Sequence, residues 1–155
     1  MIKHLKHIVK INLFIIFFTI LNASIDIQAA RRVAENIIIE RSNHNNSIKN
    51  FNVQEIRIKG LNNFVENIIK YLSSVNKIYI SFDVDSLDPD SVSRGTGTPV
   101  INGLESVEII SIIKELIKTG KVVALEVSEI NPLLDNKGNV MAEKTFEIID
   151  KVFNT

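Results

Sequence analysis

The sequence contains no cysteine and no tryptophan, and only three histidines among its 155 residues. Without cysteine the chain has no disulfide framework, no thiolate metal site and no cysteine nucleophile. Three histidines are too few for a histidine-rich metal cluster, so a metal site in this chain must rest mainly on carboxylates.

A basic bias is also lacking, because 18 Lys and Arg residues are balanced by 18 Asp and Glu residues. Nucleic-acid-binding domains normally carry a basic patch or a basic overall charge, so we expect no nucleic-acid partner. Hydrophobic residues make up 45% of the chain and charged residues 23%. This composition is typical of a globular domain with a buried core and excludes a chain that is disordered by composition.

Residues 1–24 differ from the rest and form an N-terminal apolar head. Lys3, Lys6 and Lys10 precede an apolar run at residues 11–21, and small residues follow at Ala23, Ser24, Ala29 and Ala30. The order basic, apolar, small is that of a secretory signal, and the run is short for a membrane span. The alternatives are a buried strand or helix, or an unrelated sequence fused to the domain.

The body of the chain, residues 25–155, alternates predicted helices and strands. Apolar spacing predicts helices at residues 33–40, 61–72, 104–118 and 141–152. Runs rich in β-branched residues predict strands at residues 77–84 and 122–130. Residues 42–49 are polar and Asn-rich, which predicts a loop, and residues 85–103 are rich in turn-forming residues. Alternation of strands and helices predicts an α/β fold with βαβ units and a parallel sheet.

Two carboxylates, Asp83 and Asp85, follow the first of these predicted strands. Side chains two residues apart in an extended segment share one face, and α/β proteins place ligands at the carboxyl ends of their strands. Carboxylates forced together repel unless a cation or a proton intervenes, and hard oxygen ligands suit Mg²⁺ or Mn²⁺. The alternative is that Asp85 and Asp88 merely form turns before Pro89.

Two further segments contain candidate site residues. The segment Gly95-Thr96-Gly97-Thr98-Pro99 forms either a backbone-lined loop close to a ligand or a plain tight turn. Glu129 lies near the end of the second predicted strand, within Glu126-Val127-Ser128-Glu129-Ile130-Asn131-Pro132. A buried carboxylate at a strand end needs a partner, so Glu129 either holds a cationic substrate or is a solvated loop residue.

Taken together, these three stretches resemble the C-terminal half of the ureohydrolase family, and arginase is its most similar member. Val100 after the Thr-Pro pair and the Asn-Pro-Leu-Leu-Asp run at residues 131–135 resemble arginase more than agmatinase. The resemblance covers roughly residues 25–155 and is strongest from Lys77 onward. The order and spacing of three separate motifs make it a specific match.

The resemblance implies an arginase-like fold, here a partial, truncated three-layer α/β/α architecture with a parallel sheet. It also implies that two Mn²⁺ ions share a bridging hydroxide, which attacks the guanidinium carbon of L-arginine and yields ornithine and urea. By motif, Asp83 and Asp85 would be metal ligands. Glu129 would pair with the substrate guanidinium, and Thr98 would line the guanidinium pocket.

The sequence also departs from the family pattern. The family's N-terminal half supplies a Gly-Gly-Asp-His stretch, an Asp-Ala-His-x-Asp stretch and a further histidine for proton transfer, and none of these occurs here. His4, His7 and His44 match none of them. Arg94 stands where a proline is usual and Asn102 where a glycine is usual. We therefore expect at most weak Mn²⁺ binding and no arginine hydrolysis by this chain alone.

Three interpretations of function remain. The first is an arginase-type or agmatinase-type hydrolase that acts on L-arginine or a related guanidino compound and is active only if a complementing N-terminal chain supplies the missing half. A homo-oligomer is also a possible assembly. The second is a catalytically inert remnant or binding fragment of an α/β fold, and the third is an exported ligand-binding module. Because the resemblance begins near Ile25, cleavage after Ala30 would remove a core strand, which favours a cytoplasmic location. Secretion or membrane association follows only if residues 1–30 act as a leader.

Overall fold

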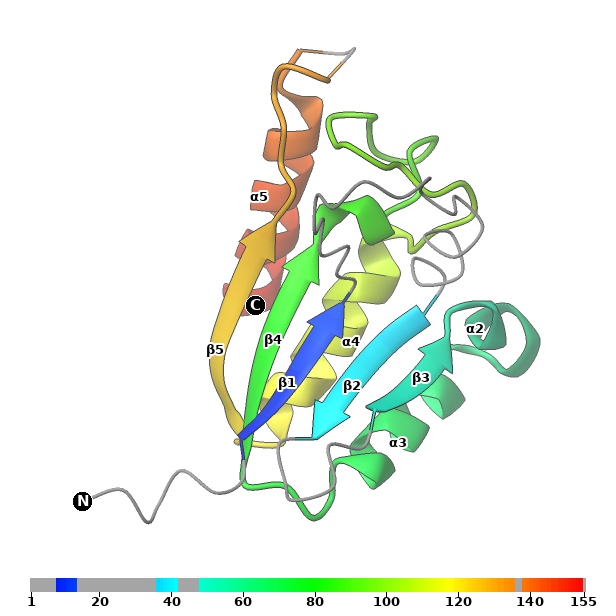
Figure 1. Cartoon of the computed structure of the whole chain (residues 1–155), viewed down its shortest axis with the longest axis vertical. Helices are drawn as coiled ribbons and strands as arrows, with labels where there is room; N and C mark the ends of the chain where they lie inside the picture. The colour runs from blue at the N-terminus through cyan, green and yellow to red at the C-terminus, as the bar shows by residue number, and fades with distance from the viewer. Residues whose placement is uncertain (1–7, 14–35, 42–47, 136–137, 155) are drawn as a thin grey trace, which may run out of the picture.

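The computed structural model describes residues 8–13, 36–41, 48–135 and 138–154. Within them the strands form one sheet in the order β3-β2-β1-β4-β5 (Figure 1). The strands are β1 (Ile8–Leu13), β2 (Asn36–Arg41), β3 (Ile48–Asn52), β4 (Lys77–Asp83) and β5 (Val122–Ser128).

The three strands β1, β4 and β5 are parallel, whereas β2 is antiparallel to both β1 and β3. The strands predicted at residues 77–84 and 122–130 are confirmed as β4 and β5. They are paired with each other, and Asp83 lies opposite Ser128. Phe82 lies opposite Leu13 on the other side. The carboxyl ends of the three parallel strands therefore meet at one edge of the sheet, which is where α/β folds place ligands.

One predicted helix is wrong. Residues 36–40, inside the helix predicted at 33–40, belong to strand β2. The consecutive isoleucines Ile37, Ile38 and Ile39 favour extended backbone because β-branched side chains lose rotamer freedom in a helix. Pairing with β1 and β3 then supplies the backbone hydrogen bonds. Similarly, the segment predicted as a loop at 42–49 ends in the first residues of β3.

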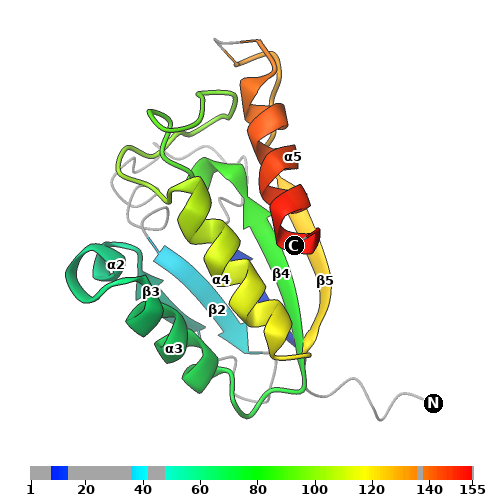
Figure 2. The same cartoon turned by 180° about the vertical axis from the view of Figure 1, so that it is seen from behind.

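The helices are α2 (Gln54–Lys59), α3 (Leu61–Tyr71), α4 (Ser106–Lys118) and α5 (Val140–Phe153). The last three confirm the helices predicted at residues 61–72, 104–118 and 141–152, while the short α2 was not predicted. Helices α3, α4 and α5 lie on one face of the sheet (Figures 1 and 2). The predicted partial α/β architecture with a parallel sheet is confirmed, and in the described residues these three helices cover one face of the sheet.

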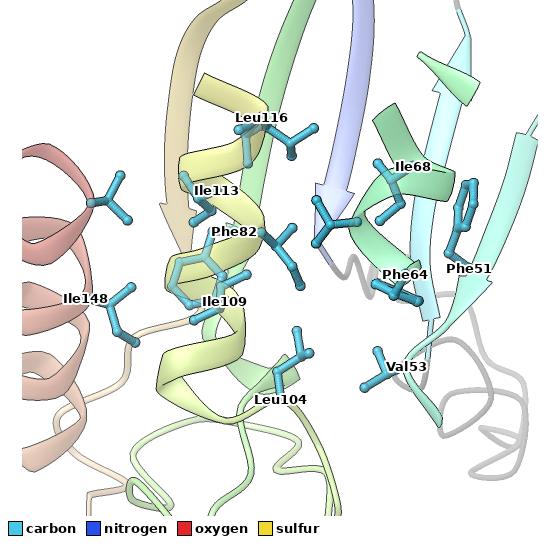
Figure 3. Close-up of a cluster of buried hydrophobic side chains, with 14 of the residues drawn as sticks. Phe51, Val53, Phe64, Ile68, Phe82, Leu104, Ile109, Ile113, Leu116 and Ile148 are labelled. Atoms are coloured by element: carbon cyan, nitrogen blue, oxygen red, sulfur yellow. The ribbon is translucent and has the colours of Figure 1, made fainter. Parts of the chain in front are cut away.

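The core lies between this helical layer and the sheet. Phe82 of β4 packs among Ile109 and Ile113 of α4 and Ile148 of α5 (Figure 3). A second group surrounds Phe64 of α3 and Phe51 of β3, whose rings meet edge to face with centroids 6.3 Å apart. Burying one such side chain contributes roughly 1.5–3 kcal/mol. These contacts fix β4, and with it the strand end that carries the two aspartates.

Several predictions concern residues that the structure does not describe. The boundary between residues 24 and 25, the core strand expected at residues 25–30, and His4, His7 and His44 all lie outside the described residues. Of the apolar run at residues 11–21, the first three residues belong to β1. In the described ranges, no helix is both long enough and apolar enough to cross a membrane.

Candidate metal and substrate site

The candidate site begins where β4 ends at Asp83. The chain then makes one 3-10 turn, η1 (Val84–Ser86), and the Asp83 carboxylate closes it by accepting a hydrogen bond from the Asp85 backbone N–H at 2.9 Å. The Ser86 hydroxyl donates to the Asp83 carbonyl oxygen at 2.6 Å. Asp85 therefore lies in the turn and not in the strand, so the turn, and not the strand period of two, places it beside Asp83.

Both carboxylates are buried, since Asp83 and Asp85 are each 2% exposed. The pKa of Asp83 is raised from 3.8 to about 8, chiefly by burial. The hydrogen bond from the Asp85 N–H opposes this rise in pKa, and the charges of Asp85 and Glu129 contribute to it. The pKa of Asp85 is raised from 3.8 to about 6, again chiefly by burial. The Thr98 hydrogen bonds oppose this rise in pKa, and the charge of Glu129 contributes to it. The pair therefore forms a site in which negative charge is poorly compensated.

The two oxygens of the Asp85 side chain have different surroundings. The Thr98 hydroxyl donates a hydrogen bond to Oδ2. Among the described residues, Oδ1 is buried with no hydrogen-bond partner, and the same holds for the hydroxyl of Thr96. A buried polar atom without a partner is costly, and a cation would satisfy a carboxylate oxygen. The donor set of Asp83 and Asp85 therefore fits a hard divalent cation such as Mn²⁺ or Mg²⁺.

The loop that carries Thr98 is hydrogen-bonded at its C-terminal end to the η1 turn and the residues that follow it. Leu104 N–H donates to the Ser86 carbonyl at 2.7 Å, and Asp88 N–H donates to the Leu104 carbonyl at 3.0 Å. Gly103 passes so close that a Cβ there would lie 2.5 Å from the Ser86 carbonyl oxygen. A glycine is thus required for the loop to fold back over the turn, and this close packing brings Thr98 to Asp85.

Glu129 follows β5 directly and has a left-handed backbone conformation, with φ at 66°. Non-glycine residues rarely adopt this conformation, and such strain often marks a functional position. The register of the sheet places Ser128 opposite Asp83, and the Glu129 charge acts on both aspartates. The sharp turn after β5 therefore keeps Glu129 near the metal-site candidates.

The structure gathers the four predicted site residues, Asp83, Asp85, Thr98 and Glu129, at the same edge of the sheet. In the described part of the chain, no group of three or more His, Asp or Glu side chains is arranged to hold a metal ion. Glu129 therefore does not complete a ligand trio with the aspartates. The roles of all four residues stay predictions.

Several supporting residues were missed by sequence reasoning. Ser86 and Thr96 lie in motifs that were recognised, but their burial depends on loop packing that no pattern reports. Asp135 accepts a hydrogen bond from the Ser93 hydroxyl, 42 residues earlier in the chain. The only sequence signal for Asp135 was its place in the Asn-Pro-Leu-Leu-Asp run.

Comparison with known proteins relates this arrangement to one family. The Arginase family model matches residues 19–154. Human Arginase-1 (Homo sapiens) is 38% identical over 110 residues, which cover 70% of this chain and 31% of that protein. The structure is similar to that of arginase from Bacillus subtilis, with a TM-score of 0.61 and 30% identity over 68% of this chain and 38% of the other.

A more distant structural similarity is to proclavaminate amidino hydrolase from Streptomyces clavuligerus. Its TM-score is 0.55 and its identity 27%, over 65% of this chain and 33% of the other. In each comparison the chain spans about a third of the length of the protein that it matches.

Proposed function

We propose, from the premise that this chain belongs to the arginase family, that its site serves the hydrolysis of a guanidino group. The substrate proposed is L-arginine and the products are ornithine and urea. The observation that carries the proposal is the buried pair Asp83 and Asp85, of which one oxygen, Asp85 Oδ1, is buried without a hydrogen-bond partner.

In this proposal Asp83 and Asp85 would hold Mn²⁺, for which their oxygen atoms are suitable ligands. When bound, the metal lowers the pKa of a coordinated water and so supplies the nucleophile at neutral pH. The protein contributes orientation. The Asp85 N–H and the Ser86 hydroxyl keep Asp83 in place, and the Thr98 hydroxyl holds one oxygen of Asp85 while the other stays available.

Glu129 is proposed to bind the guanidinium group. A carboxylate pairs with a planar guanidinium through two parallel hydrogen bonds, which fixes the plane of the substrate as well as its position. The proximity of Glu129 to the aspartates supports this role. Thr98, which donates a hydrogen bond to Asp85, would then line the guanidinium pocket.

The proposed activity needs more ligands than the two aspartates. The family resemblance implies histidine ligands that this sequence does not contain. We therefore propose that hydrolysis requires a complementing chain that supplies them. A binding fragment without catalytic activity is the second proposal, because Glu129 can bind a guanidinium in the absence of the nucleophile, and such binding does not lower the barrier.

Agmatine or another guanidino compound is an alternative substrate. The similarity to an amidino hydrolase favours the guanidino group as the common feature, since Glu129 and the aspartates would contact that group and not the rest of the substrate.

The proposal is tested by titrating the chain with Mn²⁺ in a calorimeter. We expect weak binding that is lost in the Asp83→Asn/Asp85→Asn double variant and kept in Asp90→Asn, whose side chain is exposed. Equal binding by the parent chain and the double variant would contradict the metal site. Titration of the Mn²⁺-loaded chain with L-arginine and with agmatine then identifies the preferred guanidino compound, and Glu129→Gln should weaken both.

A further inference from the structure

Three segments that are distant in the sequence meet at the side chain of Asp135, beside the candidate site. One carboxylate oxygen accepts a hydrogen bond from the Ser93 hydroxyl. The other accepts from the Met141 backbone N–H at 2.7 Å, at the start of α5. Ser93 is completely buried. The Asp135 carboxylate therefore joins the loop that leads to Thr98 with the first turn of the last helix.

Gly95 packs against Asp135 and Met141. A Cβ at Gly95 would lie 2.6 Å from the Met141 Cβ and 3.0 Å from the Asp135 Cβ. The Gly95 carbonyl oxygen accepts a hydrogen bond from the Asn131 N–H at 2.9 Å, and Asn131 follows Glu129 by two residues. The loop at Ser93 and Gly95 is thus bonded to the segment after β5 at two places, through Asn131 and through Asp135.

We propose that Asp135 is a positioning residue that sets the place of Glu129 relative to Asp83 and Asp85. On one side, Ser93 and Gly95 lead within a few residues to Thr98, which binds Asp85. On the other side, Asn131 is bonded to this loop and lies next to the turn at Glu129. This inference rests on the proposed function, because it concerns the spacing between the proposed metal ligands and the proposed guanidinium-binding residue.

A carboxylate suits this position for two physical reasons. It accepts hydrogen bonds at both oxygens, so it can bind a side-chain hydroxyl and a backbone N–H at the same time. Its negative charge at the start of α5 is also favoured by the helix dipole. A role restricted to helix capping would stabilise α5 without affecting the spacing between the loop and Glu129, and this difference can be measured.

The absence of cysteine from the sequence makes site-specific spin labelling direct. Asp90→Cys places one nitroxide on the segment between η1 and α4, and Leu133→Cys places the other on the segment that follows β5. Both positions are exposed: the Asp90 side chain is 78% exposed and Leu133 is 96% exposed. Pulsed electron paramagnetic resonance then gives the distribution of distances between the labels. Dilution with unlabelled chain removes distances between copies.

We expect a narrow distribution in the doubly labelled parent and a broad one when Asp135→Ala is added. Asp135→Asn should restore the narrow distribution, because its amide oxygen can accept from Met141 N–H while its nitrogen donates to the Ser93 hydroxyl. The matched control is Asp150→Ala. Asp150 lies on α5, and its side chain accepts a hydrogen bond from Asn154 at the exposed end of that helix. The distance distribution should stay narrow in this variant.

A second measurement separates positioning from folding. In the Mn²⁺-loaded chain we expect Asp135→Ala to weaken L-arginine binding about fivefold or more and to change the Mn²⁺ affinity about twofold or less. L-arginine needs Glu129 and the aspartate pair at the correct spacing, whereas Mn²⁺ needs only the aspartates, so a misplaced Glu129 lowers the affinity for L-arginine alone. If the parent binds neither Mn²⁺ nor L-arginine, the proposed function fails, but the label distances still test the positioning role.

An unchanged distance distribution in Asp135→Ala would overturn the inference. If Asp135→Ala does not fold, Ser93→Ala removes the same contact from the loop side and should broaden the distribution. A narrow distribution in Ser93→Ala would then overturn it as well.

Discussion

Single residues at the end of β4 determine the chemistry that the site can support. Asp83 and Asp85 are held in buried positions by neutral donors, the Asp85 N–H and the Thr98 hydroxyl. Neutral donors stabilise a carboxylate less than a cation does, so both groups have raised pKa values. A site of this kind favours either a proton or a bound cation, and pH distinguishes the two.

The first prediction concerns the pH dependence of stability without metal. Because the pKa of Asp83 is raised to about 8, its ionised form is disfavoured in the folded state. Its contribution to the free energy of unfolding is therefore fully present below about pH 4 and is lost as the pH rises through about 8. In EDTA, we expect the Asp83→Asn variant and the parent to have equal free energies of unfolding near pH 4. At pH 8.5 the free energy of unfolding of the variant should be higher by on the order of 1–3 kcal/mol.

Urea denaturation at several pH values measures this difference, with Asp90→Asn as the control that should follow the parent. Added Mn²⁺ should stabilise the parent at pH 8.5 and leave Asp83→Asn unaffected. A parent chain that becomes more stable than Asp83→Asn as the pH rises would show that Asp83 is ionised without cost.

The second prediction concerns the strained backbone at Glu129. Glycine adopts positive φ without the Cβ clash, so Glu129→Gly should raise the free energy of unfolding by about 1 kcal/mol. Glu126→Gly, in the interior of β5, should lower it by about 0.5–1 kcal/mol. Denaturation curves of the two variants provide the comparison. A loss of stability in both would indicate that the Glu129 side chain contributes to the fold.

At the scale of elements, the site depends on the fit between the η1 turn and the loop that precedes α4. The loop returns to the turn through the paired hydrogen bonds of Leu104 with Ser86 and Asp88. Helix α4 then begins with a capping box between Glu105 and Glu108, so the end of the loop is fixed. The conformation of the Thr98 segment is therefore set by packing at both of its ends.

The third prediction tests this packing at Gly103. A methyl group there would overlap the Ser86 carbonyl oxygen, so Gly103→Ala should destabilise the chain by roughly 1–3 kcal/mol and weaken Mn²⁺ binding. Gly97→Ala is the matched control, because a Cβ at Gly97 meets no atom within 4 Å. Thermal melts of both variants measure the effect. Equal melting temperatures would mean that the loop can move away from the turn at little cost.

At the scale of the whole molecule, β5 is the last strand of the described sheet. Val123 on this strand is 56% exposed, and Phe146 and Phe153 on the neighbouring α5 are also exposed. An unpaired strand edge beside exposed apolar side chains favours association with another chain. This surface has the properties expected of an interface.

The fourth prediction is that the chain associates in solution. Val123→Lys should increase the monomer fraction, because a charged side chain at a sheet edge disfavours edge pairing. Val107→Lys introduces the same charge at an exposed position on α4 and should have little effect. Sedimentation velocity measures both. A monodisperse parent monomer that melts cooperatively would contradict the prediction.

The fifth prediction is that the 155-residue chain alone does not hydrolyse L-arginine at a useful rate. Catalysis in this family is expected to need two metal ions held together, and one strand end offers two carboxylates. Urea release in the presence of Mn²⁺ is the measurement. Turnover that disappears in Asp83→Ala and Asp85→Ala would disprove the inactivity and support the site, whereas turnover that persists in both variants would overturn the site as well.

The sequence by itself determined the α/β class, three of the helices and the neighbouring strands β4 and β5, because these depend on local periodicity and on short turn motifs. It also identified the four residues that meet at the sheet edge. It did not identify β2, because the extended conformation of Ile37–Ile39 depends on pairing with strands elsewhere in the chain.

Only the tertiary structure decided how the site residues are presented. The 3-10 turn that places Asp85, the burial that raises the two pKa values and the left-handed turn at Glu129 all arise from packing between distant segments. The contact of Asp135 with Ser93 likewise joins residues 42 positions apart. Local patterns report which residues are near a strand end, but the surroundings of a side chain depend on long-range contacts that no local pattern contains.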